Sequence, residues 1–104
     1  MSKFTPAALA DAQKTGKPIL VEISAPWCPT CKVQKPILDR LLTSDKYKSF
    51  VTLEMDFDSQ KDDLKALKAQ MQSTLIVYKG DKEVGRSAGD TNPATIEALL
   101  AKAL

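Results

Sequence analysis

One hexapeptide organises the chain: Trp27-Cys28-Pro29-Thr30-Cys31-Lys32. It contains the only tryptophan and both cysteines of the 104 residues. The apolar, β-branched run Pro18–Ser24 precedes it and is typical of a buried strand. Apolar residues at helical spacing follow it: Val33, Ile37, Leu38, Leu41 and Leu42. The sequence therefore predicts that the cysteines lie where a strand ends and a helix begins.

Two cysteines separated by two residues at the start of a helix have a specific chemistry. The first backbone N–H groups of a helix have no helical partner and carry partial positive charge, so they stabilise an anion. A thiolate placed there has its pKa lowered from about 8.5, and the thiolate is the nucleophile of disulfide exchange. We therefore predict that Cys28 is the nucleophile. Cys31, one turn later and less exposed, is predicted to be the resolving thiol.

The hexapeptide and its strand–helix setting resemble the active site of the thioredoxin family. Trp27 and Lys32 flank the cysteines as in that family, and Pro36 lies at the spacing from Cys31 where the family carries a proline. The pair Pro29-Thr30 departs from the usual Gly-Pro, and a proline after the first cysteine is also found in glutaredoxins. The resemblance runs from about Phe4 to Leu104. It implies a thioredoxin fold, an α/β domain whose mixed central β-sheet of four to five strands has helices on both faces.

The N-terminal half fits this arrangement. Residues 1–4 leave room for a short first strand at most. Thr5 and Pro6 are expected to cap and open a helix that ends at Gly16. After the helix that follows the hexapeptide, apolar and polar residues alternate over 51–58, which predicts a strand.

The C-terminal half continues the pattern. Ser59 is expected to cap a helix whose apolar face is Leu64, Leu67 and Met71. Residues 74–78 read as a buried strand, and a Gly-Asp turn leads into an edge strand over 83–87, where Gly85 indicates a bulge. Asn92-Pro93 opens the last helix. We expect parallel pairing in the interior β-α-β units and antiparallel pairing in the closing hairpin.

The resemblance implies roles for residues around the cysteines. Glu22 stands where the family has a buried acid that exchanges a proton with Cys31, a role that requires a pKa raised by burial. The alternative is that Glu22 lies on a wetter face of its strand. Lys32 would favour the thiolate through its charge, although solvent screens that effect. Substrate contact would fall to Trp27, Pro29 and Thr30.

Ser73 is the main departure from the family. The family carries a cis-proline immediately before a threonine here, whereas this chain has Gln72-Ser73-Thr74. A cis bond before a residue other than proline costs about 2.5–4 kcal/mol, so we expect a trans or distorted Ser73. By resemblance, these three residues contact the substrate backbone. The missing proline reflects either drift in a loop, or a changed substrate set or a site that is opened beside the sulfurs.

Composition limits the function classes. A chain of 104 residues is expected to form one domain, 1–104. The net charge of +2, with basic and acidic residues interleaved, argues against nucleic-acid binding. No apolar run approaches the roughly 18 residues of a membrane span, and the N-terminus lacks a signal-peptide core, so we expect no membrane association and a cytoplasmic location. With two cysteines and no histidine, a zinc site within one chain and histidine-based catalysis are not expected.

The sequence thus predicts a monomeric protein-disulfide reductase without a bound cofactor or metal. Cys28 would attack a protein disulfide and Cys31 would release the reduced product. By resemblance, a flavin-dependent reductase or a membrane thiol relay would then reduce the Cys28–Cys31 disulfide. Two alternatives stay open. Pro29 and the missing proline could make the chain an oxidant or a glutathione-linked exchanger, or two chains could bridge a metal or iron–sulfur cluster with four cysteines.

Overall fold

Five strands and four helices make up the chain, and the computed structural model describes all of it, residues 1–104. The elements are β1 (Ser2–Lys3), α1 (Pro6–Lys14), β2 (Pro18–Ser24), α2 (Pro29–Leu42), β3 (Val51–Asp56), α3 (Lys61–Ala66), β4 (Thr74–Lys79), β5 (Lys82–Ala88) and α4 (Pro93–Ala101). The first strand has only two residues, as expected from the short segment that precedes α1. No helix combines the length and the hydropathy that a membrane crossing requires.

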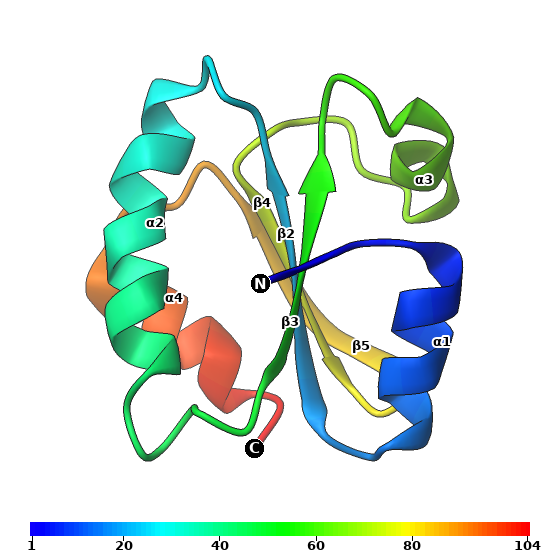
Figure 1. Cartoon of the computed structure of the whole chain (residues 1–104). Helices are drawn as coiled ribbons and strands as arrows, with labels where there is room; N and C mark the ends of the chain where they lie inside the picture. The colour runs from blue at the N-terminus through cyan, green and yellow to red at the C-terminus, as the bar shows by residue number, and fades with distance from the viewer.

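The strands form one mixed sheet in the order β1-β3-β2-β4-β5. Strand β3 lies parallel to β1 and β2, while β4 runs antiparallel to both β2 and β5. The expected parallel pairing is confirmed for β2-α2-β3 and is wrong for β3-α3-β4. Helix α3 has six residues and is therefore about 9 Å long, too short to return the chain along the sheet. As a result β4 starts at the end of the sheet where β3 finishes (Figure 1).

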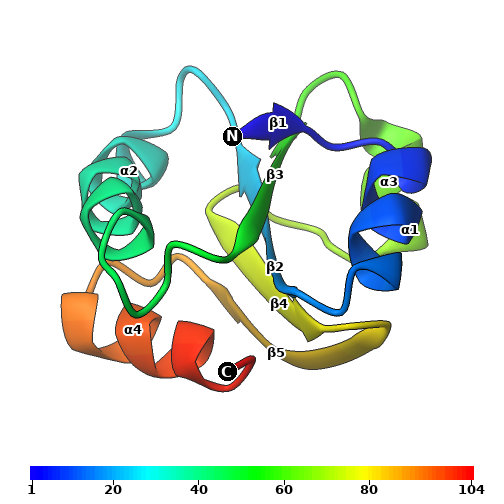
Figure 2. The same cartoon turned by 60° about the horizontal axis from the view of Figure 1, so that its bottom comes forward.

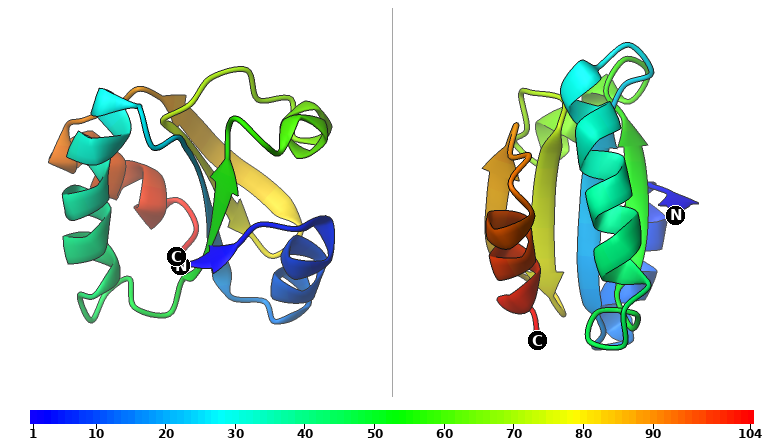
Figure 3. Two further views of the ribbon diagram at one scale, coloured as in Figure 1. Left: turned by 45° about the horizontal axis from the view of Figure 1, so that its top comes forward. Right: turned by 90° about the vertical axis from the view of Figure 1, so that its left-hand side faces the viewer.

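Helices cover both faces of the sheet. Figures 1 and 2 show α1 and α3 on one side and α2 with α4 on the other, and α2 contacts α4 on their shared face (Figure 3). The alternation of β2 divides its side chains between the two layers, because successive residues point to opposite faces. Ile19, Val21 and Ile23 enter the core beneath α1 and α3, whereas Leu20 enters the core beneath α2 and α4. Glu22 falls on the α2 side of the sheet with Leu20.

Most of the predicted helix ends are confirmed. The hydroxyl of Thr5 accepts the backbone N–H of Ala8 at 2.9 Å, and Asn92 caps α4 in the same way. Gly16 follows α1 with a φ of +72°, which a residue without Cβ adopts readily. The bulge in the hairpin is present as well, with a register shift between Val77 and Tyr78 opposite Gly85.

Two expectations about α3 are wrong. Ser59 does not cap the helix, because its hydroxyl donates to the Asp56 carboxylate at 2.6 Å and the helix starts at Lys61. Met71 does not belong to its apolar face. The helix ends at Ala66, the left-handed φ of 57° at Lys68 turns the chain away, and Met71 is left 54% exposed.

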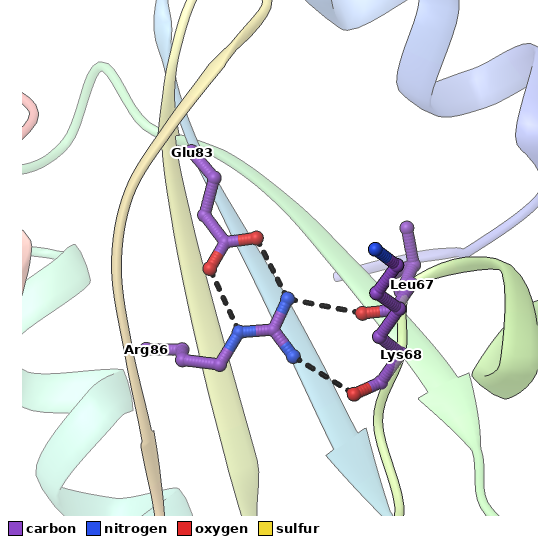
Figure 4. A network of polar contacts seen from close by, with 4 residues as sticks. All are labelled: Leu67, Lys68, Glu83 and Arg86. Carbon is purple, nitrogen blue, oxygen red and sulfur yellow. Dashed lines mark hydrogen bonds and ion pairs between the residues drawn. The ribbon is translucent and has the colours of Figure 1, made fainter.

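An ion-pair network ties the end of α3 to β5 (Figure 4). The Arg86 guanidinium donates to the Leu67 carbonyl at 3.0 Å and to the Lys68 carbonyl at 3.2 Å. It also donates twice to the Glu83 carboxylate, at 2.7 Å each. Carbonyls at a helix C-terminus lack helical partners, so Arg86 both satisfies them and fixes the segment that leads to β4.

Candidate active site

Helix α2 begins beyond the end of β2 (Figure 1), and the two cysteines lie at this start. Cys28 is the N-cap residue, and its sulfur accepts the backbone N–H of Cys31 at 3.2 Å. Pro29 occupies the first helical position, where its missing N–H leaves no bond unmade. Both thiols are free. The helix N-terminus therefore directs a hydrogen bond at the Cys28 sulfur, as the sequence predicts.

The surroundings shift the pKa values of the two thiols in opposite directions. Burial opposes ionisation of Cys28, but hydrogen bonds from the Cys31 and Ser73 side chains and from the backbone outweigh it, so the pKa of Cys28 lies below its ordinary value. Burial raises the pKa of Cys31, and the hydrogen bond with Cys28 raises it further. These directions agree with a nucleophilic Cys28 and a resolving Cys31.

The expected order of exposure is wrong. Cys28 is 1% exposed and Cys31 is 6% exposed, so the resolving thiol is the slightly more accessible one. Ser73 packs directly against both sulfurs at 3.0 Å and so covers them alike, and the difference comes from the groove beside Cys31. Cys31 lines this polar groove, which lies between β1, β3 and the start of α2.

Ser73 has a trans peptide bond and a left-handed backbone with φ of 60°, which confirms the expected distorted residue. Its N–H donates to the Ile23 carbonyl at 2.7 Å, and its own carbonyl accepts from the Gly89 N–H at 3.0 Å. Its hydroxyl oxygen lies 3.0 Å from the sulfur of Cys28 and 3.0 Å from that of Cys31. Since Ser73 is 2% exposed, the alternative of an opened wall beside the sulfurs is wrong.

Glu22 is buried, with 1% of its surface exposed, so the alternative of a wetter strand face is wrong. One of its carboxylate oxygens has no hydrogen-bond partner. Burial and then the charge of Glu54 raise the pKa of Glu22 from 4.5 to about 7, while Lys35 opposes the shift. Glu22 and Cys31 line the same groove, which has a volume of about 640 Å³ and links them to solvent. A carboxyl group with such a pKa can accept and return a proton near neutrality.

Trp27 is 54% exposed next to the cysteines. Its indole N–H donates to the Asp58 carboxylate at 2.8 Å, and its ring packs edge-to-face on Phe57 at 6.3 Å between centroids. These contacts hold an exposed aromatic surface in one orientation. Pro29 is exposed beside it and Thr30 is half-buried, so the three predicted contact residues of the hexapeptide lie together.

The other predicted residues have different surroundings. Lys32 is exposed and lines the groove that Cys31 and Glu22 share. Gln72 is half-buried, whereas Thr74 is buried and its hydroxyl donates to the Met71 carbonyl at 2.6 Å. The Thr74 side chain thus stabilises the turn, and only the backbone of this residue is left to contact a substrate.

Sequence reasoning missed three residues of the site: Gln34, Glu54 and Asp58. Gln34 is fully buried, and its amide N–H₂ donates to the carbonyls of Ser73 and Asp90 at 3.1 and 2.7 Å. The one available signal was its place, three residues after Cys31 and so on the same side of the helix. Glu54 lies next to Glu22 because the two are partners in the parallel β2–β3 register. The sequence of either strand alone does not give the register of their pairing, so it could not predict that these two residues lie side by side.

Comparisons with known proteins agree with this geometry. The family model described as Thioredoxin matches residues 3–102. Thioredoxin-2 of Saccharomyces cerevisiae is 33% identical over 95 residues, which cover 91% of this chain and 86% of that protein. Thioredoxin of Rattus norvegicus is 34% identical over 84 residues, covering 81% of this chain and 77% of the relative.

Solved structures give the same result. The crystal structure of Trxlp from Edwardsiella tarda is similar with a TM-score of 0.92 and 36% identity, covering 95% of this chain and 96% of that one. Mitochondrial thioredoxin 3 of Saccharomyces cerevisiae shares the fold with a TM-score of 0.83 at 22% identity, over 97% of this chain and 93% of that one. The predicted fold is confirmed, and the two alternative functions are not favoured by these similarities.

Proposed function

The chain belongs to the thioredoxin family, and we propose that it reduces protein disulfides, with Cys28 as the nucleophile and Cys31 as the resolving thiol. As a member with an intact cysteine pair it is a thiol-disulfide oxidoreductase. What we propose beyond this activity is that electrons pass to the substrate and that the two cysteines have these separate roles. The backbone N–H of Cys31 supports these roles, because it donates to the Cys28 sulfur at 3.2 Å. This hydrogen bond stabilises negative charge on the Cys28 sulfur and not on that of Cys31.

The reaction runs in two exchanges. The Cys28 thiolate attacks one sulfur of the substrate disulfide, forms a mixed disulfide and releases the other substrate sulfur as a thiolate, which takes up a proton. Cys31 then loses its proton and attacks the Cys28 sulfur. The substrate leaves as a dithiol, a Cys28–Cys31 disulfide remains, and two electrons have passed to the substrate.

Glu22 is proposed to receive the Cys31 proton. Support comes from the groove that both residues line and from a pKa near 7, which lets the carboxylate take a proton at neutral pH and return it later. Trp27, Pro29 and Thr30 are proposed to contact the substrate beside Cys28, together with the backbone of Gln72, Ser73 and Thr74. Lys32 is proposed to add a favourable but screened charge.

Thioredoxins act on disulfide substrates and are themselves reduced by partners. For this chain we propose a flavin-dependent reductase or a membrane thiol relay as the electron donor. A reductant must be kept reduced, which fits a compartment such as the cytoplasm, where thiols stay reduced. We also propose that the chain acts as a monomer of one domain, 1–104.

The test combines turnover with trapping. A peptide with one disulfide is the substrate, and the parent is compared with Cys28→Ser and Cys31→Ser. Dithiothreitol supplies electrons in the turnover assay, whereas trapping uses the pre-reduced proteins after dithiothreitol has been removed, because it would reduce the mixed disulfide. We expect both variants to lose turnover and only Cys31→Ser to accumulate a mixed disulfide, located at Cys28 by mass spectrometry. Equal trapping by both variants would contradict the assigned roles, and turnover by Cys28→Ser would contradict the mechanism.

A further inference from the structure

A hydroxyl oxygen stands between the two reacting sulfurs, because Ser73 Oγ lies 3.0 Å from Cys28 Sγ and 3.0 Å from Cys31 Sγ. We propose that Ser73 is a further catalytic residue, whose hydroxyl donates its hydrogen to whichever cysteine sulfur carries negative charge. It thereby favours the reduced dithiol over the disulfide. This inference rests on the exchange proposed above and concerns what tunes it.

The Ser73 hydroxyl can form hydrogen bonds with both sulfurs at once. A serine hydroxyl has one hydrogen to donate and two lone pairs to accept with. It can therefore donate to one thiolate while the other sulfur, still protonated, donates to it. Hydrogen bonds to charged groups are about twice as strong as those between neutral groups. The hydrogen consequently follows the charge between the two sulfurs.

The backbone of Ser73 is held by hydrogen bonds that keep the residue beside the two sulfurs. Its N–H is bound by Ile23 at 2.7 Å, and its carbonyl is bound by both Gly89 and the Gln34 side chain. The glutamine is 0% exposed and also holds the Asp90 carbonyl. Gln34 is thus a positioning residue, and the hydroxyl it helps to place is fixed before any charge forms, the condition under which a hydrogen bond contributes most to catalysis.

A proline at position 73 would keep only the carbonyl acceptor. It has neither a hydroxyl nor an N–H, and its φ is fixed near −65°, whereas the observed φ is 60°. The departure from the family at this point therefore coincides with a polar arrangement in which Gln34, Ser73 and the two sulfurs are linked in one chain of hydrogen bonds.

The hydroxyl acts in both exchanges. It first donates to the Cys28 thiolate. When that sulfur bonds to the substrate it becomes neutral, and the hydroxyl turns to the Cys31 sulfur as this thiol gives its proton to Glu22. The Cys31 thiolate then attacks Cys28 and both sulfurs end neutral in the disulfide. Because only the reduced form offers the hydroxyl a charged acceptor, Ser73 makes the pair easier to keep reduced and harder to oxidise.

The test compares Ser73→Ala and Ser73→Gly with the parent. Both remove the hydroxyl, and glycine tolerates the left-handed φ, so a thermal melt of Ser73→Gly separates loss of the hydroxyl from loss of the fold. Ser87→Ala is the matched control, because the Ser87 hydroxyl has no hydrogen-bond partner. Thiolate absorbance against pH gives the pKa of Cys28, and equilibration with glutathione buffers gives the potential.

We expect both Ser73 variants to show about a tenfold lower acid dissociation constant at Cys28, the size of a hydrogen bond to a charged group. The glutathione equilibrium should move about tenfold toward the Cys28–Cys31 disulfide, or about 30 mV toward a stronger reductant. Parent values in a folded Ser73→Gly, or changes in Ser73→Ala alone, would overturn the proposal. In that event Cys31→Ser would still trap substrate at Cys28, whereas failure of the proposed function would abolish trapping whatever occupies position 73.

Discussion

The substitution Glu22→Gln tests the buried acid through its effect on stability. Glu22 is 1% exposed, and its pKa is raised from 4.5 to about 7. One pKa unit corresponds to about 1.36 kcal/mol. Keeping Glu22 ionised in the folded protein therefore costs about 3 kcal/mol relative to the unfolded chain, a cost that glutamine does not incur.

The sign of the pH dependence follows from the pH range in which the folded and the unfolded protein each bind the Glu22 proton. Below pH 4.5 the carboxyl group is protonated in both states and has no effect. Between 4.5 and about 7 the unfolded chain loses the proton while the folded protein retains it, so the free energy of unfolding falls as the pH rises. Above about 7 the full cost is present. The parent should thus lose about 3 kcal/mol relative to Glu22→Gln between pH 4 and 8.

The assay is urea denaturation of both proteins across this pH range. A buried glutamine amide that lacks partners costs about 1–3 kcal/mol at every pH, so the quantity to compare is the pH dependence of the difference and not its value at one pH. Asp81→Asn, which changes an exposed carboxylate in the β4–β5 turn, is the control for the loss of one carboxylate. A flat difference for Glu22→Gln would refute the raised pKa and, with it, the proton-accepting role.

Three further substitutions test the surroundings of the site. Glu54→Gln removes the neighbouring charge that raises the pKa of Glu22, so the pH range over which the parent loses stability should shift downward in the same denaturation series. Gln34→Met removes the amide that donates to the Ser73 and Asp90 carbonyls, of which Ser73 keeps only the Gly89 N–H; it should lower the free energy of unfolding by about 1–3 kcal/mol, and an unchanged denaturation midpoint would count against the positioning role. Gly85→Ala places a Cβ 2.8 Å from Leu99 Cδ1 and should cost about 1–3 kcal/mol, a loss that Leu99→Val in the same chain partly offsets if the close contact is its cause.

Local patterns were sufficient for most of the fold. Alternation in β3 and the apolar run of β2 predicted strands, and Thr5, Gly16 and Asn92 marked helix ends that the structure confirms. One error arose where two local partners compete. Ser59 is a good capping residue, yet its hydroxyl binds Asp56 instead, a choice that depends on how β3 leads into the following turn.

The site itself was predicted in part. The hexapeptide identified the cysteines and their helix N-terminus, and the missing proline identified Ser73 as unusual. The contacts of Ser73 join residues far apart in the sequence, since its hydroxyl meets sulfurs on α2 and its carbonyl meets Gln34. Such contacts follow from tertiary packing, as does the greater burial of Cys28 than of Cys31. No periodicity or spacing in the sequence encodes them.

The proposed mechanism requires that Cys28 and not Cys31 is the reactive thiolate. The most direct measurement is alkylation of the reduced protein by iodoacetamide at about pH 7, with each modified cysteine located and timed by mass spectrometry. Exposure alone favours Cys31, at 6% against 1%, whereas the lowered pKa of Cys28 and the raised pKa of Cys31 favour Cys28. We expect Cys28 to be modified first and Cys31 to follow only at higher pH. Modification of Cys31 first, or of both at one rate, would contradict this mechanism.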